Sequence, residues 1–368
     1  MSAVPVLPVS STNARPSRLR RLVKPLVTPV VFDFWASRLN PLWRWDRPLA
    51  KVVEKRIEST DSVTLVLRPN RHWQGFQPGQ HVNLGVDVDG ARLWRSYSLT
   101  NAPGSDRLSI TVKRIAGGKL SAHLAERVQV GDLLDIGPAF GEMVLPATPM
   151  PSLFLAAGSG ITPLISLVRT LAAQGMPLPV TLMYWARTRE ELCFVEELRA
   201  LAARHANLQV RFVLTRQSAE AGDEVVGRIE AAHLAALGAL GAHCVYACGP
   251  SGFTAAAATL VQGQAARFLC EAFTPPPRQD SDIGTVQVQL TASGRSLTLP
   301  RGVSLLEALE AEGLRPTHGC RMGLCNTCVC GKSAGTTRDL STGTLHSEPS
   351  AALKLCVSSA TSDLVLEL

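Results

Sequence analysis

The stretch His318-Gly-Cys-Arg-Met-Gly-Leu-Cys-Asn-Thr-Cys328 contains three cysteines in one short loop, and a fourth cysteine follows near the end of the chain. Cys320, Cys325 and Cys328 have the spacing C-x4-C-x2-C, and Cys356 completes the set of four. Three thiolates from one tight loop, with a fourth from elsewhere in the fold, are the ligands of a 2Fe-2S cluster. The sequence therefore predicts such a cluster at this loop.

Two other uses of these cysteines stay open at this point. Zinc sites usually combine two C-x2-C or C-x2-H pairs, whereas only Cys325 and Cys328 form such a pair. Disulfides need an oxidising compartment, but the first thirty residues hold five prolines and no continuous apolar segment of a secretory signal. A cluster in a cytoplasmic protein is the favoured interpretation. Cys330 is expected only to pack, and His318 only to hydrogen-bond within the loop.

The composition of the chain bounds its organisation. Its 368 residues, 46% hydrophobic and 18% charged, can form two or three domains with cores of their own. The net charge of +7 is concentrated at one end, because residues 1–48 hold eight Arg or Lys against two Asp. The rest of the chain is nearly neutral, which argues against a nucleic-acid-binding face on the body of the protein.

Residues 1–45 form a basic and aromatic extension. Residues 1–24 mix Pro, Ser and Arg and are expected to be a flexible tail. Residues 30–45 are rich in Phe and Trp, but the run is too short and too interrupted to span a bilayer. This composition is typical of an interfacial anchor, although packing of the aromatics against the first domain is the simpler explanation. The hypothesis is a cytoplasmic protein in peripheral contact with the inner membrane.

Residues 46–146 read as a small antiparallel β-barrel. Apolar residues alternate over residues 63–67, 82–88 and 108–112, and Asp89-Gly90 is a hairpin signal. The barrel contains Arg95-Ser-Tyr97-Ser98, and a glycine turn, Gly117-Gly-Lys-Leu-Ser121, opens a helix predicted to begin at Ser121. An aromatic ring, a cation and the backbone N–H groups of a glycine turn are what a flavin dinucleotide needs.

Residues 147–274 alternate between strand and helix patterns, which predicts a doubly wound parallel sheet. The strand at residues 152–157 leads into Gly158-Ser-Gly160, with Thr162 as the expected N-cap of a helix. Thr188-Arg-Glu-Glu191 has the form of a capping box that opens the next helix. The strand at residues 243–247 ends at Cys248-Gly-Pro250. Residues 275–284 are a proline-rich linker, and residues 285–368 have the element order of a β-grasp domain.

These motifs together resemble the ferredoxin–NADP reductase superfamily, and the C-terminal part resembles a plant-type ferredoxin. The resemblance implies that Tyr97 and Ser98 contact the flavin ring and Arg95 its pyrophosphate, and that the glycine turn favours FAD over FMN. It further implies phosphate contacts from Gly118, Lys119, Leu120 and Ser121, and nicotinamide-nucleotide contacts from Gly158, Gly160, Thr162, Cys248, Gly249 and Pro250, with Thr162 and Cys248 near the ring. Phe273 would cover the flavin until nicotinamide displaces it, with core packing as the alternative.

The choice between NADPH and NADH is expected at the end of the second strand of this sheet. A 2′-phosphate favours cations there, and a free ribose favours a carboxylate. Arg187, Arg189 and Arg216 favour NADPH, although Glu190 and Glu191 stand nearby. NADH therefore remains the alternative.

A flavin between nicotinamide and the cluster converts a two-electron donor into a one-electron donor. The order of modules resembles reductases that pass electrons to a separate acceptor. The cluster loop and the aromatic extension resemble the reductases of bacterial membrane-bound acyl-CoA (stearoyl-CoA) desaturases, which are di-iron fatty-acid desaturases. The reductase of an alkane or aromatic-ring hydroxylase or dioxygenase is the alternative acceptor assignment. A redox-sensing electron carrier without turnover is the alternative of another class.

Overall fold

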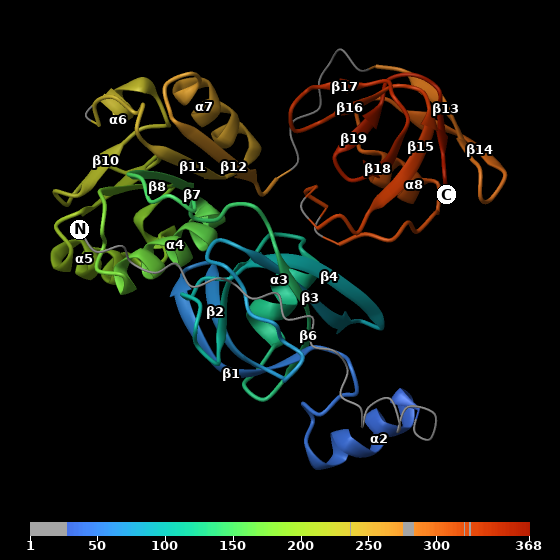
Figure 1. The fold of residues 1–368 in the computed structure, drawn as a ribbon, viewed down its shortest axis with the longest axis horizontal. Coiled ribbons are helices and arrows are strands. Elements are labelled where there is room, and N and C mark those ends of the chain that lie inside the picture. Colours follow the sequence, from blue (N-terminus) through green and yellow to red (C-terminus); the bar gives the residue numbers. More distant parts are fainter. Residues whose placement is uncertain (1–27, 236, 275–282, 320, 324) are drawn as a thin grey trace.

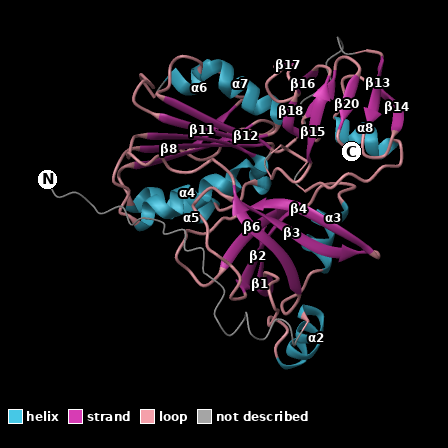
Figure 2. Cartoon of the chain, turned by 45° about the vertical axis from the view of Figure 1, so that its right-hand side comes forward, coloured by secondary structure: helices cyan, strands magenta, loops and turns pink. Residues whose placement is uncertain are grey.

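The computed structural model describes residues 28–235, 237–274, 283–319, 321–323 and 325–368 (Figure 1). The predicted flexible tail at residues 1–24, most of the predicted linker at 275–284 and the predicted ligand Cys320 lie outside the described residues. Three modules follow one another along the chain, as the sequence predicts, and a short N-terminal helix precedes them (Figures 1 and 2).

An antiparallel barrel forms the first module. Its strands are Leu49–Ser59 (β1), Ser62–Pro69 (β2), His81–Val88 (β3), Ala91–Ser98 (β4), Leu108–Lys113 (β5) and Leu133–Phe140 (β6). They pair in the order β4-β3-β6-β1-β2-β5, and a bridge between Leu99 and Ile110 joins the two edges. Asp89 and Gly90 connect β3 to β4 with positive φ angles of 50° and 77°, which is the geometry of the predicted Asp-Gly hairpin. The predicted barrel is confirmed.

A six-stranded parallel sheet forms the second module. Its strands are Ser152–Ala157 (β7), Val180–Ala186 (β8), Leu208–Leu214 (β9), Glu224–Val226 (β10), Cys244–Gly249 (β11) and Arg267–Ala272 (β12), in the order β10-β9-β8-β7-β11-β12. Its helices are Ile161–Ala173 (α4), Val195–Arg204 (α5), Ala231–Ala235 (α6) and Ser251–Val261 (α7). Helices α4 and α5 cover one face and α6 and α7 the other (Figure 1). This confirms the doubly wound sheet, whose strand order reverses on either side of β7.

Three helix starts differ from the sequence expectation. The helix expected at Ser121 begins at Lys119 as a four-residue turn, Lys119–Ala122 (α3), followed by a π-helical turn, His123–Arg127. Gly160 occupies the N-cap of α4, so Thr162 lies inside the helix, where its hydroxyl donates to Ser159 O. The capping box at Thr188 opens only a 3-10 turn, and α5 starts later, after Phe194 in a left-handed conformation.

The C-terminal module has a five-stranded mixed sheet and a smaller sheet. The larger sheet contains Thr285–Leu290 (β13), Arg295–Pro300 (β14), Val329–Ala334 (β15), Ser350–Lys354 (β18) and Leu364–Leu366 (β20), in the order β14-β13-β20-β15-β18. The smaller sheet contains Thr337–Asp339 (β16), Leu345–His346 (β17) and Ser358–Ala360 (β19). Helix Leu305–Ala311 (α8) begins after Ser304, whose hydroxyl caps it by accepting from Glu307 N–H. The parallel pairing of β13 with β20 completes the predicted β-grasp arrangement.

The N-terminal helix, Pro29–Leu39 (α2), projects from the barrel away from the other two modules (Figures 1 and 2). The segment after it is tied to the barrel, because Asn70 Nδ2 donates to Leu42 O and Arg47 O. Trp45 is buried at this junction, whereas most aromatics of α2 are exposed. Packing against the first domain therefore accounts for only part of the aromatic run. Among the described helices, we find none with the length and apolarity needed to cross a bilayer.

Candidate functional site

A cavity of about 490 Å³ lies where all three modules meet. From the barrel it is lined by the predicted residues Arg95, Tyr97, Ser98, Gly118, Lys119, Leu120 and Ser121. The nucleotide module contributes Ser159, Thr162 and Phe273, and the cysteine-rich loop contributes Arg321 and Met322. The sequence motifs that were predicted to bind one flavin are thus gathered around one space.

Strand β4 supplies the aromatic and cationic groups of this cavity. Alternation along the strand places Arg95 and Tyr97 on the same face. Burial raises the pKa of Tyr97 well above its ordinary value, so its phenol is neutral and can pack as an apolar ring with a hydroxyl donor. Burial, and then the nearby Arg321 cation, lower the pKa of Arg95. Arg95 is therefore a partly desolvated cation, suited to an anionic ligand.

The turn before α3 is built for close approach of a ligand. Ser121 Oγ accepts from Ile115 N–H and donates to Gly118 O, at 3.2 and 3.4 Å, which fixes the turn from inside. A side chain at Gly118 would meet Ser121 Oγ at 2.6 Å, so glycine is required there. Gly117 has a φ of 73°, which also favours glycine. The backbone of the turn is consequently exposed to the cavity, as phosphate binding requires.

One buried hydroxyl tests whether a flavin fits this cavity. Ser98 Oγ is buried and has no hydrogen-bond partner among the described residues. Buried hydroxyls in proteins are almost always satisfied, and Ser98 lines the cavity beside Tyr97. A ligand with ring nitrogen and oxygen atoms at this place would satisfy Ser98, so the residues present fit a flavin.

The turn after β7 and the turn after β11 pack directly on one another. A side chain at Gly160 would collide with the backbone of Cys248 and Gly249, so only glycine allows this contact. Both turns lie at the carboxyl ends of their strands, at the point where the strand order reverses. Pro250 follows as the N-cap of α7. The two predicted nucleotide loops therefore form one crevice at the switch point.

Cys248 is fully buried behind this crevice and does not line the cavity itself. Burial, with the Glu271 carboxylate adding to it, raises the pKa of the Cys248 thiol well above its ordinary value. The sulfur is therefore a neutral group, available for packing and weak hydrogen bonding rather than as a nucleophile.

A buried pair that no sequence motif predicts joins the barrel to the nucleotide module. His81 on β3 and Glu271 on β12 are both buried, with Nε2 and Oε2 2.9 Å apart. Phe273 packs its ring edge-on against His81, at 6.2 Å between centroids, and its N–H donates to Gly249 O. His81 also lines the cavity. Glu271 stands two residues before Phe273 in sequence, but nothing in the pattern links it to His81, because the contact is between modules.

The cysteine-rich loop brings together two of the predicted metal ligands. Cys328 and Cys356 are buried with their sulfur atoms 3.2 Å apart, and Gly323 N–H donates to Cys356 Sγ. Cys325 is less buried and lies near Gly319, where an added side chain would meet its sulfur at 2.8 Å. No three metal-binding side chains converge within the described part of the chain, of which Cys320 is not a member. Adjacent thiols and an N–H directed at sulfur fit an iron–sulfur cluster.

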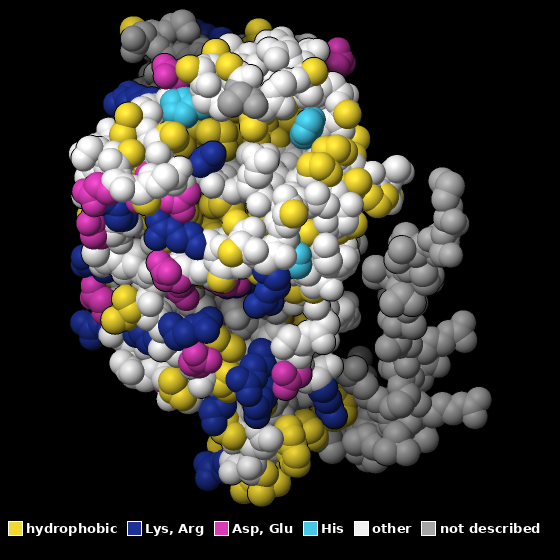
Figure 3. Space-filling model, turned by 90° about the vertical axis from the view of Figure 1, so that its left-hand side faces the viewer, with side chains coloured by type: hydrophobic (Ala, Val, Ile, Leu, Met, Phe, Trp, Pro, Cys, Tyr) yellow, Lys and Arg dark blue, Asp and Glu magenta, His cyan; other side chains and the backbone are white. Residues whose placement is uncertain are grey.

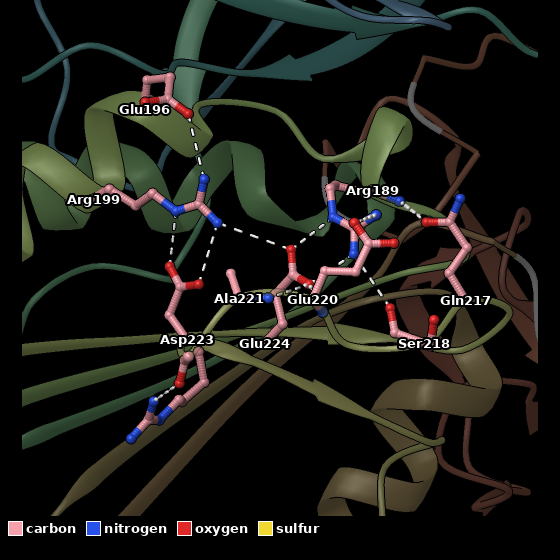
Figure 4. Close-up of polar contacts among 11 residues, drawn as sticks. Arg189, Glu196, Arg199, Gln217, Ser218, Glu220, Ala221, Asp223 and Glu224 are labelled. Carbon is pink, nitrogen blue, oxygen red and sulfur yellow. Dashed lines mark hydrogen bonds and ion pairs between the residues drawn. The ribbon is translucent and has the colours of Figure 1, made fainter.

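Three arginines that follow strands β8 and β9 of the nucleotide module differ in their ion pairs. Arg189 donates two hydrogen bonds of 2.8 Å to Glu224, whose side chain is 1% exposed (Figure 4). These bonds lower the pKa of Glu224 to about 2, although burial acts in the opposite direction. Arg187 pairs with Glu191 at 2.8 Å. Arg216 is exposed, and its guanidinium makes no ion pair with any described residue, so it is the cation most open to a ligand.

Three protein families match successive parts of the chain. Residues 49–144 match the oxidoreductase FAD-binding domain, and residues 154–259 match the oxidoreductase NAD-binding domain. Residues 288–361 match the 2Fe-2S iron-sulfur cluster binding domain. These matches and the fitting sites above show that the cofactors are FAD, NAD(P)H and a 2Fe-2S cluster.

Whole proteins are also similar to this chain over most of their length. An NADPH oxidoreductase of Mycobacterium tuberculosis is 34% identical, over 95% of this chain and 92% of that protein. A glycine betaine monooxygenase reductase subunit of Pseudomonas aeruginosa is 29% identical, over 81% and 89%. The solved structure of phthalate dioxygenase reductase has the same fold, with a TM-score of 0.58 at 24% identity, over 87% of this chain and 97% of that one. The chain therefore belongs to the ferredoxin–NADP reductase superfamily and is an NAD(P)H-dependent, FAD-containing oxidoreductase that ends in a 2Fe-2S module.

Proposed function

We propose that this protein carries electrons from NADPH to a membrane-bound di-iron fatty-acid desaturase. The observation that carries the proposal is the cavity lined by the barrel, the nucleotide module and the cluster loop together. When bound, FAD supplies the conversion of one hydride into single electrons, so that each NADPH yields NADP+, one proton and two one-electron reductions at the cluster. The residues of the chain bind and orient these groups.

We assign roles to five residues in or behind the wall of the cavity. Tyr97 and Ser98 contact the flavin ring, and the unpartnered hydroxyl of Ser98 supports this assignment. Thr162 contacts the nicotinamide from the first turn of α4, and Cys248 supports the same ring from behind Gly160. Phe273 covers the flavin face, and its place in the cavity wall supports this.

NADPH is the proposed donor because of Arg216. Arg216 lies two residues after β9, and its N–H donates to Arg187 O, so the two residues lie side by side at the carboxyl ends of neighbouring strands. Arg187 shares its charge with Glu191 and is the second candidate for the 2′-phosphate. The name of the Mycobacterium relative, NADPH oxidoreductase, agrees with this choice.

A membrane-bound acceptor is supported by the surface of α2. Trp35 is 63% exposed and Leu39 81% exposed, and Val30, Val31, Phe34 and Trp43 are exposed beside them. Arg38 stacks over the rings of Phe34 and Trp35. In Figure 3 hydrophobic side chains gather at this end of the molecule with Lys and Arg side chains next to them. An apolar surface bordered by cations matches the interface of an anionic bilayer.

The alternative acceptor is a hydroxylase or dioxygenase. The Pseudomonas relative is named as the reductase subunit of a monooxygenase, and the cavity and cluster loop suit any one-electron acceptor. The apolar surface of α2 favours the membrane-bound desaturase over a soluble oxygenase.

Reconstitution tests the acceptor. NADPH, this protein and membranes that contain an acyl-CoA desaturase are combined, and oxygen-dependent unsaturation of an acyl-CoA is followed. We expect desaturation that stops when NADPH or the protein is left out. Support of a soluble ring-hydroxylating oxygenase, with no desaturation, would replace the proposal by the alternative.

Vesicle binding tests the membrane contact separately. The full chain should sediment with phosphatidylglycerol vesicles, and the double variant Trp35→Glu, Leu39→Glu should not. Ile57→Glu is the control, because Ile57 is a hydrophobic residue on the barrel that is at least as exposed as Trp35 and Leu39. If the double variant sediments as well as the control, α2 does not bind the bilayer.

A further inference from the structure

The cluster loop passes the flavin cavity in a strained conformation. Arg321 has a φ of 60°, in the left-handed region that side chains other than glycine rarely adopt. The loop therefore needs an interaction that holds Arg321 in place. The residue that follows, Met322, lines the flavin cavity together with Arg321.

Glu310, in the last turn of α8, provides that interaction. Arg321 Nη1 and Nη2 donate to Glu310 Oε2 and Oε1 at 2.7 and 2.5 Å, which is a two-point ion pair between a helix and the loop. Arg321 Nη2 also lies 2.8 Å from His318 Nε2, while His318 Nδ1 lies 3.0 Å from Pro316 O. Nε2 then accepts from Arg321 and Nδ1 donates to Pro316 O, so both ring nitrogens of His318 hold the loop.

The same ion pair balances charge at the cavity wall. Arg321 is close enough to Arg95 for its cation to lower the pKa of Arg95. Burial by itself would raise the pKa of Glu310, but the hydrogen bonds and charge of Arg321 bring it below its ordinary value, and Arg95 adds to this. Glu310 is thus ionised and neutralises one of two neighbouring cations, which leaves Arg95 as the cation of this trio available to a phosphate.

A displacement of Arg321 would move residues that contact both the flavin cavity and a predicted cluster ligand. One residue further along the chain, Met322 forms part of the flavin cavity. The next, Gly323, donates its N–H to Cys356 Sγ at 3.2 Å and accepts from Lys354 Nζ at 2.7 Å. Three consecutive residues therefore connect the ion pair, the cavity wall and a predicted cluster ligand.

We propose that the Glu310–Arg321 ion pair is a positioning device that keeps Met322 in the wall of the flavin cavity and so fixes the path by which electrons leave the flavin for the cluster. Glu310 touches neither cofactor site and acts through the loop. The proposal rests on the FAD and the 2Fe-2S cluster, and it does not depend on which acceptor the cluster serves.

Two variants and two controls test the proposal in the full-length holoprotein. Glu310→Gln removes the charge of the ion pair, and Met322→Ala removes the wall directly. Glu312→Gln is the control for the first, because Glu312 is exposed and its carboxylate makes no hydrogen bond or ion pair with another residue that the structure describes. Met322→Leu keeps the bulk of the wall and is the control for the second. The visible circular dichroism of the cluster reports whether each variant is loaded.

Two readouts separate positioning from general stability. The first is quenching of flavin fluorescence by iodide, which measures solvent access; we expect the quenching constant to rise about twofold or more in Glu310→Gln and Met322→Ala. The second is anaerobic stopped-flow. Flavin reduction by NADPH should keep its rate in Glu310→Gln, which lies outside the cavity wall, while the following cluster reduction should slow about tenfold in both variants. Glu312→Gln should behave as the wild type, and Met322→Leu should keep the quenching constant and the rate of cluster reduction that Met322→Ala loses.

Three results would overturn the proposal. One is equal iodide quenching and equal cluster reduction in Glu310→Gln and Glu312→Gln. Another is wild-type behaviour of Met322→Ala in both readouts, which also decides the question if Glu310→Gln does not retain its cluster. The third is an equal slowing of flavin reduction and cluster reduction in loaded Glu310→Gln, since that would indicate a general structural role.

Discussion

On the nucleotide side, the flavin cavity is closed by Ser159, Thr162 and Phe273; on the cluster side, it is closed by Arg321 and Met322. We call these the entry wall and the exit wall. The entry wall belongs to the turn after β7, the first turn of α4 and the end of β12, in a sheet that is covered by helices on both faces. The exit wall is a loop that the Glu310–Arg321 ion pair holds to α8.

This difference shows where the molecule can be changed without loss of its fold. The entry wall is tied to buried groups such as Cys248 and Glu271, so substitutions there disturb the sheet as well as the site. The exit wall depends on few side chains, so substitutions there should alter electron output while hydride input continues. Variants that affect one wall only therefore test the comparison.

The largest effect is expected for Cys325→Ser. Loss of a cluster ligand should lower the rates of cytochrome c reduction and of the partner oxygenase by about 100-fold or more. The variant should still bind FAD and still reduce ferricyanide. Cys330→Ala is the control, because burial raises the pKa of Cys330 to about 12 and its thiol is inert. A Cys325→Ser variant that drives the partner at the wild-type rate would show that electrons bypass the cluster.

Arg95→Ala should lower electron input and electron output equally, because Arg95 binds the flavin that lies between the two walls. Loss of a charge-assisted contact to the pyrophosphate should raise the FAD dissociation constant about 10- to 100-fold. Flavin release on dilution, followed by fluorescence, measures this. Arg68→Ala, at an exposed position on β2, should retain FAD. Equal retention by both variants would remove Arg95 from the flavin site.

Arg216→Ala should affect the entry side alone. We expect kcat/KM for NADPH to fall about tenfold or more, with kcat/KM for NADH unchanged, because only NADPH carries the 2′-phosphate. Arg204→Ala, an exposed arginine in the last turn of α5, is the control. A wild-type protein that prefers NADH contradicts the assignment of Arg216.

Glu224→Gln should leave both walls, and hence electron transfer, unchanged. Because the pKa of Glu224 is about 2 in the folded chain and near 4.5 when unfolded, its carboxylate stabilises the fold above pH 4.5 and loses this effect as the pH falls toward 2. The difference in Tm between the wild type and the variant should be present at pH 7 and shrink by pH 3. A constant difference across this range would mean that the charge of Glu224 is not what stabilises the fold.

Much of the fold follows from local pattern. The buried run of residues 152–157 and the alternation of residues 286–290 coincide with β7 and β13, because hydrophobic period and strand geometry agree there. Helix starts were less predictable. The capping box at Thr188 was outweighed by the left-handed Phe194, whose side chain is buried in the core.

Only those parts of the site that consist of one continuous sequence motif could be predicted. The glycine turn, the Arg-Ser-Tyr-Ser strand and the cysteine spacing each identify their group from local sequence. The partners His81 and Glu271, or Arg189 and Glu224, are far apart in the chain and meet only through the fold. Arg321 lies inside the cysteine motif, yet its place in the flavin wall depends on how two modules dock.

The most direct test of the account is anaerobic stopped-flow of the wild-type holoprotein with NADPH at several protein concentrations, with flavin and cluster absorbance recorded together. Electrons that enter at the entry wall and leave at the exit wall of one molecule should reduce the flavin first. The cluster should follow at a rate independent of protein concentration. A cluster that is reduced before the flavin, or at a rate proportional to protein concentration, would contradict the account.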